Sequence, residues 1–101
     1  MPITPAMSIF DSKYNVTVSS TPLSLIDFGF TQEQLRMARY AHITVETAGI
    51  RYGFGFHAIN ANVGKQVASG ADVTIEGTQN ILNLMQVADS SDASVNVDLA
   101  R

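Results

Sequence analysis

Aromatic rings set between glycines are the residues of this sequence whose types and spacing come nearest to a binding motif. The stretch GIRYGFGFHAI, from Gly49 to Ile59, contains Gly-Phe-Gly-Phe. RNA-binding β-sheets expose two or three such rings so that bases stack on them. Alternation along a strand places Tyr52, Phe54 and Phe56 on one face. These three rings are therefore the candidate nucleic-acid contacts.

The motif around these rings departs from its usual form, which favours a core strand. The usual motif runs basic, glycine, aromatic, glycine, aromatic, aliphatic, any residue, aromatic. Here Tyr52, His57 and Ile59 occupy the positions of the basic residue, the aliphatic residue and the last ring. Gly53 and Gly55 fall on the opposite face, where they allow a loop or a neighbouring subunit to approach closely. Core packing is the favoured interpretation, and a single-stranded nucleic-acid-binding barrel is the alternative.

The two histidines raise the question of a zinc site. His42, Glu46 and His57 fall on the polar side of two adjacent predicted strands, and a histidine-carboxylate-histidine set can bind zinc. No His-Glu-x-x-His motif supports this arrangement. A solvated polar face is the favoured interpretation, so we predict no metal site and no cofactor.

No grouping of nucleophiles or acids predicts an enzyme. The serines stand in Ser-Ser pairs and turns, and none occupies a Gly-x-Ser-x-Gly elbow. Glu46, Asp72 and Glu76 are scattered over separate predicted strands and turns instead of being paired for acid–base chemistry. Lys65 follows Gly64 without the upstream glycine of a phosphate-binding loop. The sequence therefore predicts no catalytic residue.

The composition of the chain further restricts the classes of protein to which it can belong. The 101 residues fit one domain with one hydrophobic core. Charged residues make up only 15% of the chain, against roughly 25% in typical soluble domains, and such a surface favours self-association. The net charge of −3, without any basic run, argues against general nucleic-acid binding. The lack of cysteine excludes disulfides and thiolate chemistry, and no apolar run is long enough for a signal peptide or a membrane span.

The elements that must position these residues are mostly short strands. One helix is predicted at about 32–39, because Thr31 can cap its first turn and Gln34 occupies the reciprocal capping-box position. The segments HITVETA and IRYGFGF alternate on either side of a turn at Ala48-Gly49, which predicts a hairpin. Further strands are predicted in the segments YNVTVS, LSLI, DVTIEG, NILNLMQVA and SVNVDL, and a surface loop over 60–70. The pattern is typical of an all-β fold: an antiparallel β-sandwich or jelly-roll-like barrel of six to eight strands.

The N-terminal segment differs from the rest, because it carries two prolines and shows no periodicity. It predicts an extended arm over residues 1–12, followed by a single β-sandwich domain over 13–101. Extended arms often pack on a neighbouring molecule. The candidate assembly contacts are therefore Pro2, Ile3, Pro5, Ile9 and Phe10.

Read in order, four segments resemble a class of small bacteriophage proteins of about this length. They are VTVSSTPLSLIDFG, ARYAHITVETAGIRYGF, GKQVASGADVTIEG and NILNLMQVADSSDASVNVDL, which together cover nearly the whole chain from Val16 to Leu99. The chain departs from that class at FGFHAINAN, where those proteins carry a polar Gly-Thr-Pro-Thr loop.

The resemblance implies a virion-associated β-sandwich protein, either a capsid decoration or cement protein or a tail component. The implied location is the virion, assembled in the host cytoplasm. The implied partners are further copies of the chain, with a trimer as one option, and a phage capsid or tail protein; no membrane or nucleic-acid partner is expected. A carbohydrate-binding sandwich, in which exposed rings stack on sugars, is a third hypothesis.

Overall fold

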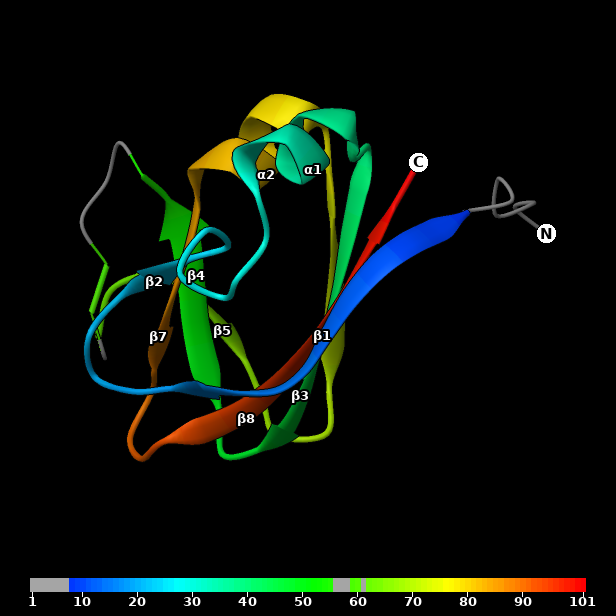
Figure 1. Cartoon of the computed structure of the whole chain (residues 1–101). Helices are drawn as coiled ribbons and strands as arrows, with labels where there is room; N and C mark the ends of the chain where they lie inside the picture. The colour runs from blue at the N-terminus through cyan, green and yellow to red at the C-terminus, as the bar shows by residue number, and fades with distance from the viewer. Residues whose placement is uncertain (1–7, 56–58, 61) are drawn as a thin grey trace, which may run out of the picture.

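The computed structural model describes residues 8–55, 59–60 and 62–101, and the structural statements below concern these residues. Eight strands and two short helices follow one another along this part of the chain (Figure 1). In chain order they are β1 (Ile9–Val18), β2 (Leu23–Ser24), α1 (Gln32–Met37), β3 (Tyr40–Thr47), β4 (Ile50–Phe54), β5 (Lys65–Val67), β6 (Asp72–Glu76), α2 (Thr78–Asn83), β7 (Leu84–Ala88) and β8 (Ala93–Ala100). None of the described helices is long and apolar enough to cross a membrane.

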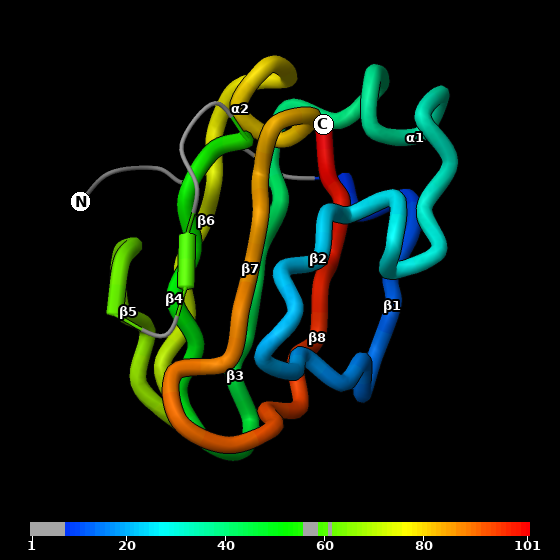
Figure 2. Tube along the Cα trace, turned by 90° about the vertical axis from the view of Figure 1, so that its left-hand side faces the viewer, coloured from blue at the N-terminus to red at the C-terminus, as the bar shows by residue number. Residues whose placement is uncertain are grey.

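The strands form two antiparallel sheets of four. Sheet 1 has the order β1-β8-β3-β6, and sheet 2 has the order β2-β7-β4-β5. The pairs β1·β8, β2·β7, β3·β6 and β4·β5 are nested along the sequence, so the chain folds like a long hairpin wrapped into two sheets. Figure 2 shows the two ends of this wrap, β1 and β8, side by side. This strand order is that of a jelly roll, and the predicted all-β sandwich is confirmed.

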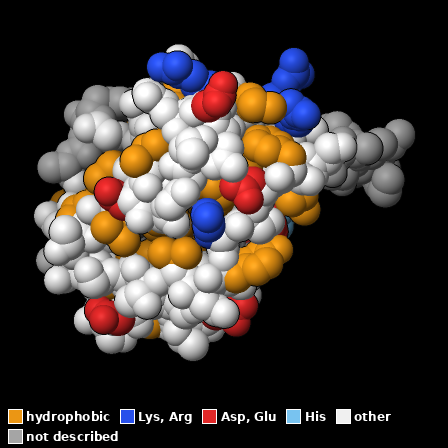
Figure 3. Space-filling view, viewed as in Figure 1, with side chains coloured by type: hydrophobic (Ala, Val, Ile, Leu, Met, Phe, Trp, Pro, Cys, Tyr) orange, Lys and Arg blue, Asp and Glu red, His pale blue; other side chains and the backbone are white. Residues whose placement is uncertain are grey.

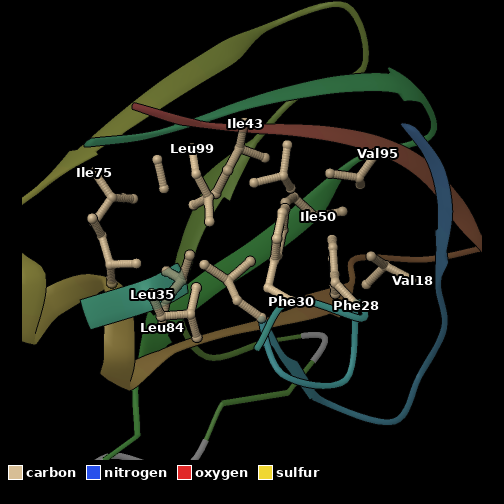
Figure 4. Packing of buried hydrophobic residues seen from close by; sticks show 14 of the residues in the cluster. Val18, Phe28, Phe30, Leu35, Ile43, Ile50, Ile75, Leu84, Val95 and Leu99 are labelled. Carbon is tan, nitrogen blue, oxygen red and sulfur yellow. The ribbon is translucent and has the colours of Figure 1, made fainter. Parts of the chain in front are cut away.

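Alternating residues of β3 and β8 build the sheet 1 side of the core. Ile43, Val45, Val95, Val97 and Leu99 are all fully buried. Successive residues of a strand point to opposite faces, so the residues between them point outward. Figure 4 shows Ile43, Val95 and Leu99 directed toward Ile50 and Leu84, which belong to sheet 2. The face predicted from the alternation of these two strands is confirmed.

The connection from β2 to α1 fills one side of the space between the sheets. Phe28 and Phe30 are buried there, and Figure 4 shows both rings within the core. Thr31 then caps α1, and Gln34 completes the reciprocal bond of the capping box, as the sequence predicts. The helix ends at Met37, two residues before the predicted end, because Ala38 has extended backbone angles.

The predicted hairpin between the third and fourth strands is wrong. β3 belongs to sheet 1 and β4 to sheet 2, and the chain crosses between the sheets at Ala48, which has a φ of 57°. Each strand has one buried face, as expected, but the two faces approach the same core from opposite sides. Alternation identifies the buried face of a strand and carries no information about the strand beside it.

Three further boundaries differ from the sequence-based prediction. The segment predicted as the strand NILNLMQVA is helical through Asn83 and extended only from Leu84. The helical spacing of its apolar residues therefore indicates the correct structure for the first half of the segment. The predicted loop over 60–70 contains β5. Residues 9–12 of the predicted arm are part of β1, and the backbone of Ser8 pairs with that of Arg101.

Candidate assembly surface

β1 is an edge strand, and two of its side chains are the most exposed large apolar residues of the described chain. Within sheet 1 it pairs only with β8, so its other edge has no partner among the described strands. Ile9 is 58% exposed and Tyr14 is 63% exposed. Two register irregularities and a φ of 57° at Asn15 bend the strand, which limits indiscriminate pairing along its free edge.

The predicted assembly contacts fall into three groups. Pro2, Ile3 and Pro5 lie outside the described residues. Ile9 is on the surface, opposite Ala100 of β8. Phe10 is half-buried against the core, with the Arg101 guanidinium 5.4 Å from the centre of its ring. Of the described candidates, Ile9 is therefore available to a partner, whereas Phe10 packs against the core and anchors β1 to it.

The end of α1 meets the end of sheet 1 beside Ile9. The Arg39 amide donates to the Ala100 carbonyl at 2.8 Å, and Gln34 Nε2 donates to Asp11 Oδ2 at 2.7 Å. These bonds hold the last turn of α1 against β8 and β1. Met37, in that turn, is 44% exposed.

We call this region the helix-end surface; its members are exposed and comprise Ile9, Arg36, Met37, Arg39 and Arg101. Figure 3 shows hydrophobic and basic side chains next to each other toward this end of the molecule. No sequence signal marks the surface, because its residues come from three separate segments. Only the pairing of β1 and β3 with β8 brings them together.

The outer face of sheet 1 is polar and internally bonded. Asp98 accepts hydrogen bonds from Ser12 Oγ at 2.5 Å and from the Tyr14 hydroxyl at 3.1 Å. His42 Nε2 lies 2.9 Å from an oxygen of Asp72. No group of three or more His, Cys, Asp and Glu residues in the described part of the chain could hold a metal ion. Of the zinc candidates, His42 and Glu46 share this face, whereas His57 lies outside the described residues.

The rings proposed for nucleic-acid binding face the inside of the sandwich. Tyr52 and Phe54 are half-buried, pack against the core and contact each other edge to face, with ring centres 6.4 Å apart. Phe56 lies outside the described residues. Bases stack on rings that a sheet exposes on its outer face. The two described rings are not placed as such a platform.

The glycines of Gly-Phe-Gly-Phe allow close packing on the outer face of sheet 2. A Cβ at Gly53 would lie 2.6 Å from the Ile59 Cγ2 methyl. The Gly55 amide donates to the Asn83 carbonyl at 2.5 Å, which continues the pairing of β4 with β7 within the sheet. The predicted close approach on the outer face is confirmed at Gly53, and the approaching residue is Ile59.

Gln86 belongs to no motif in the sequence, yet its environment is unusual. It lies on the inner face of β7, opposite Tyr52 and Leu23, and is fully buried. Neither atom of its amide group has a hydrogen-bond partner among the described residues. An unpaired buried amide costs about 1–3 kcal/mol. Its position within an apolar strand was the only available signal.

Comparisons of the chain with family models, curated proteins and solved structures find no significant match. The surfaces of the chain itself are therefore the basis for its function.

Proposed function

We propose that the protein is a non-enzymatic structural subunit of a bacteriophage virion that acts by self-association and surface contacts. Its role is capsid decoration or cementing, or participation in a tail assembly. The observation that carries the proposal is the helix-end surface, where Ile9 and Met37 are exposed among arginines beside the free edge of β1. Methionine and arginine are enriched at protein interfaces relative to the remaining surface.

The fold agrees with this role without deciding it. Jelly rolls are the domains of many viral capsid proteins, and also of lectins and cupins. Function has to be argued from a site, since one fold serves many functions. The resemblance of the sequence to small phage proteins favours the virion among these uses.

The test is the molar mass of the protein by size-exclusion chromatography with light scattering, over a range of concentrations. We expect a discrete homo-oligomer, and a variant with Ile9→Asp and Met37→Asp should dissociate to the monomer, because a charge at each position would be desolvated in the interface. Ile26→Asp is the matched control: Ile26 is 47% exposed but lies in the connection between β2 and α1. Thermal unfolding of each variant checks that the fold is kept.

Two results would contradict the proposal. One is a wild-type protein that stays monomeric at every concentration. The other is an oligomer that survives the double substitution unchanged. Adding a labelled single-stranded RNA to the same experiment tests the nucleic-acid alternative, because a monomer that shifts with RNA would favour that function instead.

A further inference from the structure

We draw no further inference here: the strongest candidate, the exposed surface patch around Ile9 and Met37 where β1 begins and α1 ends, belongs to the surface already proposed for self-association, and with exposed Glu33 and Glu76 beside its arginines nothing in the structure shows what covers it.

Discussion

The two sheets have the same number of strands and share one core, but their outer faces differ. On sheet 1 the outer face is a hydrogen-bonded polar layer around Asp98 and His42. On sheet 2, Val87 points outward from β7 yet is only 1% exposed. Ile59 and Gly64 lie against that face: the Ile59 side chain is beside Gly53, and Arg51 Nη1 donates to the Gly64 carbonyl at 2.9 Å.

The difference shows that burial in this protein is not confined to the space between the sheets. Sheet 2 has an apolar contact on each face, so outward substitutions there should act on stability. Sheet 1 has one apolar face and one solvated face, so outward substitutions there should act mainly on what the surface binds. Three experiments compare the sheets, in order of decreasing effect on stability.

The largest effect is expected when the same polar residue is placed outward on the central strand of each sheet. Val87→Asn should lower the free energy of unfolding by about 2–4 kcal/mol, because it buries an amide without a partner and removes apolar contact. Thr44→Asn, on the solvated face of β3, should cost less than about 1 kcal/mol. Urea denaturation measures both, and equal losses would remove the distinction between the sheets.

A smaller effect of opposite sign is expected on the inner face of sheet 2. Gln86→Met keeps an unbranched side chain and removes two unpaired polar atoms, so it should raise the free energy of unfolding by about 1–3 kcal/mol. Gln66→Met, on the exposed strand β5, is the control and should bring no gain because it removes a bond to Asp89. A Gln86→Met protein with a lower free energy of unfolding than the wild type would show that the buried amide makes hydrogen bonds in solution.

The smallest effect concerns the contact that closes the outer face of sheet 2. Gly53→Ala should cost about 1 kcal/mol, although alanine is normally the better strand residue, because its methyl group would meet Ile59. Combining it with Ile59→Ala should cost less than the sum of the two single changes, since the second substitution makes room for the first. Strict additivity in denaturant unfolding would mean that Ile59 does not occupy this position.

The buried faces of β3 and β8 were predictable, because every second residue is buried and therefore apolar, while the residues between are mostly polar. The capping box at Thr31 was predictable for a similar reason, since its two bonds join residues only three positions apart. No pattern of residue types in the sequence indicates that β3 and β4 belong to different sheets. A two-residue connection at Ala48-Gly49 suits a hairpin, and only the competition among all eight strands decides otherwise.

The candidate surface was predictable only in part. Ile9 was selected because it lies in a proline-bearing segment, and it is indeed exposed, although in a strand. Arg36, Met37 and Arg39 gave no signal, because a short charged helix end is ordinary in any sequence. Their proximity to Ile9 depends on the register of β8 with both β1 and β3, which is a property of the assembled sheet.

The nested order of the strands has a consequence for biosynthesis. Among the strands that the structure describes, the only neighbour of β1 is β8, and some 75 residues separate the end of one from the start of the other. At translation rates of about 5–20 residues per second, β1 leaves the ribosome about 4–15 s before its partner exists. Throughout that interval a long strand is free to pair with other nascent chains. Sheet 1 can therefore gain this edge strand only after β8, the last of the described strands, has been made.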